Sequence, residues 1–148
     1  MKLSAKVRYA LAATIRMVQI HAAEKSVTVA RLVEDLAISK IYLEQIFSLL
    51  KRGRIVTSIK GARGGYLLAR PAQQISVYEI IAAVDASLFS RTPKTVDNNA
   101  PDIEATMHTV IFDKLDKTII TTLSDITLAT LAAETEKHRG KDNYMYYL

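Results

Sequence analysis

The sequence predicts a mainly α-helical fold with one small β-hairpin, and three observations support this prediction. Two helical patterns follow each other across a short turn between residues 28 and 52. Two short β-prone runs then flank a glycine-rich tip between residues 55 and 69. From residue 102 to about residue 122, apolar residues recur at helical spacing. This order predicts a winged helix-turn-helix domain followed by a long dimerisation helix.

The first three helices are predicted from their caps and their apolar periodicity. Ser4 is placed to cap a first helix that runs to about Ala23, and Thr28 and Ser39 are placed to cap the next two. In the third helix, either Ile41 or Tyr42 is expected to face the core. Gly53 follows this helix, where a left-handed residue often ends a helix. The first helix is expected to bury Val7, Leu11, Thr14, Ile15, Val18 and Ala22.

The hairpin and a fourth helix complete a predicted domain at residues 1–85. Residues 55–59 are rich in β-branched side chains, and glycines in the tip allow a tight loop. Ser76 and Glu79 have the spacing of a capping box, which opens a helix to about Asp85.

The second half of the chain is expected to serve assembly. Residues 86–101 contain two of the three prolines and suggest either a linker or a loop that crosses to the next element. Residues 102–136 are expected to form dimerisation helices, the second starting near Thr127, and residues 137–148 a polar tail. The N-terminal domain leaves little surface to cover the long helix, so a second copy is its expected partner. The stripe consists of Ile103, Met107, Val110, Ile111, Leu115, Ile119 and Leu123.

Composition narrows the class of protein. The 148 residues are 49% hydrophobic, which is enough for a core, and include no cysteine, which excludes disulfides and cysteine-ligated metals. No apolar run approaches the roughly 20 residues of a membrane helix, and no secretory signal is evident at the N-terminus. We therefore expect a cytoplasmic protein without a membrane partner.

Charge is distributed unevenly between the two halves. Residues 1–75 carry 13 Lys and Arg against four Asp and Glu, a balance of +9, whereas residues 76–148 carry seven against 11, a balance of −4. A basic N-terminal half indicates a polyanion as its partner.

The third helix and the hairpin carry the residues expected to bind double-stranded DNA. Reading bases in the major groove requires a helix whose N-terminal residues reach the base edges. Glu44 can accept from cytosine N4, Gln45 can pair with adenine, and Lys40 can reach guanine or a phosphate. Taken singly, each Lys or Arg is more simply a solvated charge, and Tyr42 could equally be a core residue. The predicted DNA-binding set is Lys2, Ser4, Lys6, Tyr9, Thr28, Ser39, Lys40, Tyr42, Glu44, Gln45, Arg54, Ser58, Lys60, Arg63, Gly64 and Gly65.

Several blocks of the chain resemble the Rrf2 family of bacterial transcription regulators. They are residues 1–11, 38–46 (with the run YLEQ), 61–71 (with the run GGY), 80–85 and 126–131. The resemblance implies a homodimer, crossed through the long helix, with two winged domains on a pseudo-palindromic operator. It also implies that the region around Glu44 reads bases and that the wing around Lys60 lies on the adjacent minor groove.

The chain departs from the family where many members hold an iron–sulfur cluster on three cysteines. This region has Ser90, Thr92, Thr95 and Asn98 instead, and thiolate ligation is impossible without cysteine. We expect no cofactor, so the regulatory input must differ. Two smaller departures are Val7 in place of the usual glycine, and Arg63 at the wing tip.

The C-terminus is similar to that of a cluster-free family member that represses cysteine metabolism in complex with cysteine synthase. This similarity suggests that a metabolic enzyme could capture Tyr146, Tyr147 and Leu148. The simpler alternative is a tail that packs on its own dimer or stays disordered. A competing function is therefore a protein-interaction module in which DNA binding is weak or lost.

An enzyme is not expected. His21, His108 and His138 have no partners at metal-ligand spacing, and no catalytic triad, phosphate loop or paired carboxylates stand out. The histidines are better explained as core or interface residues.

Overall fold

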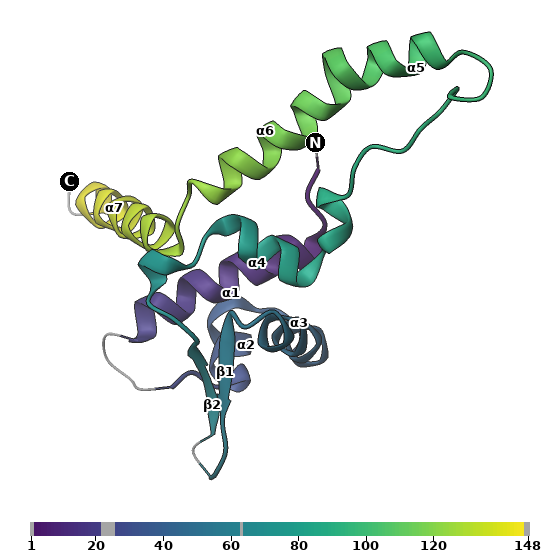
Figure 1. The fold of residues 1–148 in the computed structure, drawn as a ribbon. Helices are drawn as coiled ribbons and strands as arrows, with labels where there is room; N and C mark the ends of the chain where they lie inside the picture. The colour runs from purple at the N-terminus through teal and green to yellow at the C-terminus, as the bar shows by residue number, and fades with distance from the viewer. Residues whose placement is uncertain (1, 22–25, 63, 147–148) are drawn as a thin grey trace.

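The computed structural model describes residues 2–21, 26–62 and 64–146, and only the backbone of residues 142–146. It is mostly helical with one two-stranded antiparallel hairpin, which confirms the predicted fold class (Figure 1). The elements are α1 (Ala5–His21), α2 (Val29–Leu36), α3 (Lys40–Arg52), β1 (Val56–Ile59), β2 (Gly65–Leu68), η1 (Ala72–Gln74), α4 (Val77–Val84), η2 (Ala86–Phe89), α5 (Pro101–Met107), η3 (His108–Phe112), α6 (Asp113–Ser124) and α7 (Leu128–Tyr146).

The hydrophobic core lies between α1, α3 and α4. Each of these helices contributes fully buried side chains, including Met17 from α1, Phe47 from α3 and Ile80 from α4. Burial of one such side chain typically stabilises a fold by about 1.5–3 kcal/mol. This packing holds α3 at the surface of the domain, beside the hairpin (Figure 1).

The predicted helix caps are confirmed. The Ser4 hydroxyl accepts a hydrogen bond from the Val7 amide at 3.3 Å. The Thr28 hydroxyl accepts one from the Arg31 amide at 3.1 Å, and the Ser39 hydroxyl accepts one from the Tyr42 amide at 3.2 Å. A full capping box joins Ser76 and Glu79 at the start of α4. Local chemistry of this kind depends on a few neighbouring residues, which is why the sequence predicts it well.

The expected left-handed conformation at Gly53 is wrong. Gly53 has φ −78°, and the left-handed residue is Arg54 with φ 59°. A Cβ at position 53 would lie 2.5 Å from the Cβ of Ala83, which is too close for any side chain. Glycine is therefore needed here because α3 and α4 approach each other closely, and not because of its backbone angle.

The hairpin is a short wing anchored to the chain that enters α2. Its register pairs Val56 with Leu68 and Ile59 with Gly65. Val27 and Tyr66 exchange backbone hydrogen bonds of 2.9 and 2.7 Å, which adds a third extended segment to the wing.

The segment between η2 and α5 is a loop that crosses to the long helix and is held against it. The Thr92 amide and hydroxyl both donate to Asp116, each at 2.9 Å. The Thr95 and Val96 amides donate to the Glu104 carboxylate at 2.9 and 2.6 Å. The part of residues 86–101 that forms this loop lies between η2, which ends at Phe89, and α5, which begins at Pro101.

The predicted long helix is a continuous arm that projects from the body of the molecule (Figure 1). It consists of α5, a π-helical turn at η3, and α6. A π-helical turn widens the helix by one residue and often marks a functional site.

The last helix is longer than expected. It was predicted to end near Glu136, yet α7 continues to Tyr146. Its first part packs on the body through the buried residues Leu128 and Ala132. Farther along, Glu134 faces Lys137 at 3.5 Å, and such i,i+3 pairs support a helix that periodicity alone does not reveal. Within the described residues, no helix combines the length and apolar character needed to cross a membrane.

Candidate nucleic-acid interface

At the start of α3, contact with α1 separates the side chains that pack inward from those that face solvent. Tyr42 turns toward α1, where its ring meets that of Tyr9 edge-on with centroids 5.4 Å apart. Ile41 points away and is 71% exposed. The structure therefore decides the open question of the sequence: Tyr42 packs inward and Ile41 faces solvent.

The outer face of α3 presents the polar side chains expected to read bases. Lys40, Glu44 and Gln45 are all exposed. Lys40 Nζ lies 4.0 Å from Glu44 Oε1, and an exposed ion pair of this length contributes at most about 1 kcal/mol. Both side chains are thus free to exchange this contact for hydrogen bonds to a base or a phosphate.

The start of α1 lies next to this face. The Tyr9–Tyr42 contact brings the first turns of α1 and α3 together, and Lys2 and Ser4 precede that turn as exposed residues, with Lys6 half-buried. The N-terminal turns of two helices, with lysines nearby, form a surface suited to phosphate.

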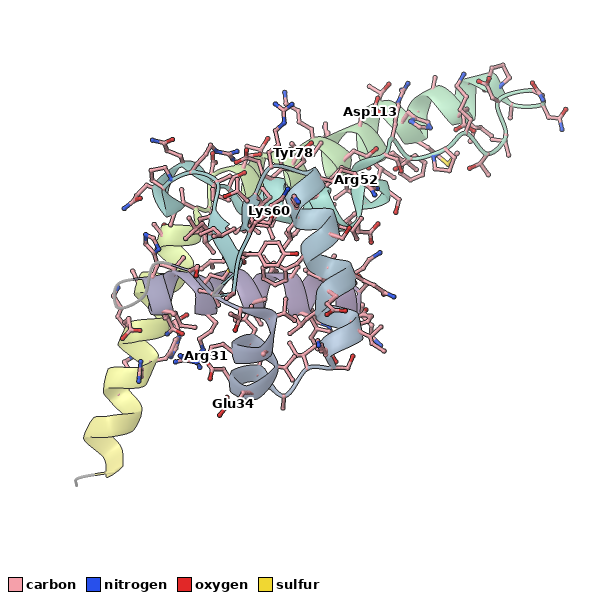
Figure 2. All side chains as sticks on the ribbon, turned by 90° about the horizontal axis from the view of Figure 1, so that it is seen from below. Arg31, Glu34, Arg52, Lys60, Tyr78 and Asp113 are labelled. Carbon is pink, nitrogen blue, oxygen red and sulfur yellow. The ribbon has the colours of Figure 1, made fainter. Side chains whose placement is uncertain are left out.

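The wing supplies the second part of the surface. Ser58 is exposed on β1. Lys60 is exposed directly after β1 (Figure 2). Arg63 lies outside the described residues. Gly65 has a structural reason to be glycine, since a Cβ there would lie 2.6 Å from the Val27 carbonyl oxygen. Gly64 is half-buried in the same turn.

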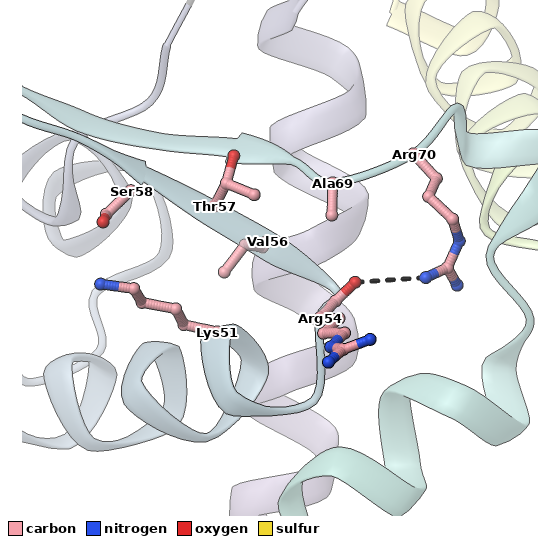
Figure 3. Close-up of a pocket in the computed structure, with 7 residues that line it drawn as sticks. All are labelled: Lys51, Arg54, Val56, Thr57, Ser58, Ala69 and Arg70. Carbon is pink, nitrogen blue, oxygen red and sulfur yellow. Dashed lines mark hydrogen bonds between the residues drawn. The ribbon is translucent and has the colours of Figure 1, made fainter.

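A hollow of about 640 Å³ separates the end of α3 from the wing (Figure 3). Lys51 and Arg54 line it as exposed cations, with Thr57 and Ser58 on the opposite side. Sequence reasoning did not include Lys51 in the binding set. Its distance of seven residues from Glu44, two turns along the same helix face, could have indicated it.

Arg70 also lines this hollow but is bound within the fold. One of its nitrogens donates to the Arg54 carbonyl at 3.2 Å, and another donates to the Glu79 carboxylate at 2.6 Å. Desolvation raises the pKa of Glu79, but hydrogen bonds from Ser76 and the charge of Arg70 outweigh it, so the pKa is lowered overall. Arg70 therefore fastens the end of the wing to α4.

The apolar stripe of the long helix divides into two parts. Met107, Ile119 and Leu123 are half-buried, and Leu123 packs against the core of the body. The other four members are between 47% and 56% exposed: Ile103, Val110, Ile111 and Leu115. Several large apolar side chains exposed on one helical arm usually mark an interaction site.

Comparison with known proteins agrees with this geometry. A model of the Rrf2 family, described as an iron-dependent transcriptional regulator, matches residues 3–134. The chain belongs to the Rrf2 family. The HTH-type transcriptional regulator IscR of Sodalis glossinidius (strain morsitans) is 36% identical over 136 residues, which cover 92% of this chain and 81% of that protein.

Solved structures show the same fold. The global cysteine regulator CymR of B. subtilis superimposes with a TM-score of 0.74 at 26% identity, over 90% of this chain and 98% of that one. IscR of T. potens gives a TM-score of 0.74 at 29% identity, over 99% and 97%. The protein is thus a DNA-binding transcription regulator with a winged helix.

The region that holds a cluster in many Rrf2 proteins has no ligands suited to one here. The chain contains no cysteine. Thr92 and the backbone at Thr95 are instead hydrogen-bonded to Asp116 and Glu104. Throughout the described ranges, no three His, Asp or Glu side chains are grouped as a metal ion would require. The side chains present do not fit an iron–sulfur cluster.

Most of the predicted partner-binding tail of this Rrf2 protein lies outside the residues that the structure describes. Tyr147 and Leu148 lie outside the described residues, and Tyr146 is described by its backbone alone. Capture of a metabolic enzyme by the tail stays a prediction.

Proposed function

We propose that the protein is a repressor that binds a pseudo-palindromic operator as a homodimer, in the cytoplasm and without an iron–sulfur cluster. The observation that carries this proposal is the single surface formed by the outer face of α3 and the wing. That surface combines groups that can read bases, Glu44 and Gln45, with cations that can hold phosphates, Lys40 and Lys60.

The charge of the chain favours DNA as the ligand of this surface. Residues 1–75, which contain α3 and the wing, carry 13 basic and four acidic side chains. Each phosphate contact releases counterions, so such a surface binds more weakly as salt rises.

The exposed stripe on the long helix supports a homodimer. A second copy would cover Val110, Ile111 and Leu115 with its own equivalent residues, since a two-fold interface brings the same patch of both chains together. Two winged domains related by that axis would face half-sites about one helical turn apart. A dimer on a promoter blocks access to it, which is why we propose repression.

The absence of cysteine supports regulation without a cluster. Carboxylates already satisfy the backbone of the crossing loop, so the loop needs no metal to hold its position. The protein is accordingly proposed to bind DNA independently of iron supply.

The first test is selection of bound fragments from random DNA at about 0.15 M salt. We expect a shared pseudo-palindrome, and a reporter driven by a promoter containing it should be silenced by the protein. Sequence-independent retention, or activation of the reporter, would contradict the proposal.

A pair of variants tests the surface itself. Lys60→Ala should weaken binding to the selected site and lower the slope of log affinity against log salt by about one. Lys137→Ala removes an exposed lysine from α7 and should leave both quantities unchanged. Equal effects of the two substitutions would show that charge acts without a defined surface.

A further inference from the structure

Ile41 is the most exposed of the large hydrophobic side chains in the described part of the chain. It is 71% exposed, compared with 56% for the most exposed residues of the long-helix stripe. It lies in the first turn of α3, directly after Lys40, and far along the chain from that stripe. Neither the core nor the proposed dimer contact therefore accounts for it.

The neighbours of Ile41 are those proposed to face the bases. Ile41, Glu44, Gln45 and Ser48 follow at three-, four- and seven-residue steps, so they share one face of α3. Together with Leu49 they line a shallow hollow of about 470 Å³. Leu49 is half-buried, so Ile41 is the exposed aliphatic side chain among the polar residues of this hollow.

The fixed orientation of Tyr42 explains why Ile41 cannot turn inward. Tyr42 is held on Tyr9 by the edge-on ring contact, and its amide donates to Ser39. Adjacent residues of a helix differ in direction by about 100°. With Tyr42 directed at α1, Ile41 is directed outward with Glu44.

We propose that Ile41 is a specificity-determining residue that contacts the C5-methyl group of a thymine, at one position in each half-site of the operator. This inference rests on the proposed function. The major groove presents hydrogen-bonding groups at every base pair, and thymine alone adds a methyl group there. An aliphatic side chain in the first turn of a recognition helix matches that group and no other base edge.

The size of the effect follows from burial of one methyl group. Removing the thymine methyl should weaken binding about fourfold per half-site, and about 15-fold when both half-sites are changed. The variant Ile41→Ala should fold normally, because Ile41 is not part of the core and alanine favours a helix. Ile41→Val keeps a branched aliphatic side chain and serves as the matched control.

The test uses two random DNA pools, one with thymine and one with uracil in its place. Uracil pairs in the same way and keeps the O4 acceptor, but lacks the methyl group. The wild type and Ile41→Val should select one T per half-site from the thymine pool, with that preference reduced about fourfold in the uracil pool. In the thymine pool, Ile41→Ala should show only the reduced preference that the wild type shows in the uracil pool, and the two proteins should behave alike in the uracil pool. The other positions of the site should be unchanged.

Each other outcome overturns the inference in a distinguishable way. An identical consensus from both pools leaves the proposed function intact and shows that Ile41 reads no methyl group. An unchanged T preference in Ile41→Ala has the same meaning, and is expected if Ile41 instead docks another protein. No consensus in either pool overturns the proposed function together with the inference.

Discussion

Arg54 shows how a single backbone angle can link the stability of the fold to its surface. Its φ of 59° is a left-handed value that costs a side chain with a Cβ about 1 kcal/mol or more. The turn nevertheless keeps its hydrogen bonds, from the Arg54 amide to Lys51 at 3.0 Å and from Arg70 to the Arg54 carbonyl at 3.2 Å. The arginine at this strained position is best explained by binding to DNA, since its charge lies at the hollow beside the wing.

We expect Arg54→Gly to separate these two effects. Glycine adopts a left-handed φ without strain, so the free energy of unfolding should rise by about 0.5 kcal/mol after the entropy of glycine is subtracted. Affinity for the selected operator should fall because one cation is lost. Urea denaturation and a binding titration measure the two quantities.

The matched control for this change is Arg52→Gly. Arg52 is the last residue of α3 and is also exposed, but its backbone is helical, so glycine there should lower stability by up to about 1 kcal/mol. If both glycine variants were destabilised alike, the strain assigned to Arg54 would be wrong.

Residues governed by their nearest neighbours could be predicted from the sequence, whereas those governed by packing could not. Thr28, Ser39 and Ser76 cap their helices as expected, because a cap needs only the next three residues. The orientation of Tyr42 depends on Tyr9, 33 positions away, and the need for Gly53 depends on Ala83. Neither contact leaves a periodic pattern in the sequence.

At the scale of elements, the crossing loop is positioned by carboxylates on the long helix. Glu104 is 2% exposed, accepts hydrogen bonds from two loop amides, and has an oxygen 3.1 Å from His108 Nε2. The hydrogen bond from the Val96 amide is the main cause of a lowered pKa at Glu104, against the desolvation that raises it. Asp113 is desolvated too, yet hydrogen bonds from His108 and Arg91 lower its pKa.

These lowered pKa values predict sensitivity to acid. A carboxyl group with a lower pKa in the folded state binds fewer protons there than in the unfolded chain, so stability rises with pH. The contribution is fully present above the ordinary pKa of 4.5 for Glu104 and is lost as pH falls below it. We expect the free energy of unfolding of the wild type to fall steeply below about pH 4.5.

Glu104→Gln tests the source of this dependence. The variant should be less stable than the wild type at pH 7, and the difference should shrink as pH falls below 4.5 and the glutamate takes up a proton. Urea denaturation across this range measures it. Glu34→Gln, at an exposed position of α2, is the control and should follow the wild type at every pH. A difference that stays constant with pH would show that the Glu104 charge does not hold the loop.

The sequence predicted the long helix well and the parts joined to it less well. Seven apolar residues at helical spacing are a strong pattern, and it survives a π-helical turn that shifts the register by one residue. Charged pairs on an exposed face support the extension of α7 beyond Glu136. In composition, such residues cannot be told from a polar tail. The crossing loop is ordered by Asp116, 24 positions from Thr92, and by Glu104, nine positions from Thr95, and composition does not reveal such contacts.

For the whole molecule, binding to a pseudo-palindromic operator requires both the arm and the DNA-binding surface. The wing and α3 of one chain cover a single half-site, whereas a pseudo-palindrome has two. Joining two binding modules makes the second contact intramolecular and can raise the overall affinity by two to four orders of magnitude without any new contact to DNA. The exposed residues Val110, Ile111 and Leu115 lie on the arm, away from α3, where they can join two chains without covering either surface (Figure 1).

We therefore expect Leu115→Asp to produce a monomer that folds but binds the operator at least 100-fold more weakly. A carboxylate at this position would be buried against the partner without a counter-charge, whereas in a single chain it would remain in water. Analytical ultracentrifugation should show the wild type at twice the mass of the variant, with similar helix content by circular dichroism.

Thr109→Asp, which adds the same charge at an exposed polar position of the arm, should remain dimeric and bind as the wild type does. If Leu115→Asp stayed a dimer, the two chains must meet elsewhere, and if it became a monomer with full affinity, the operator would require only one winged domain.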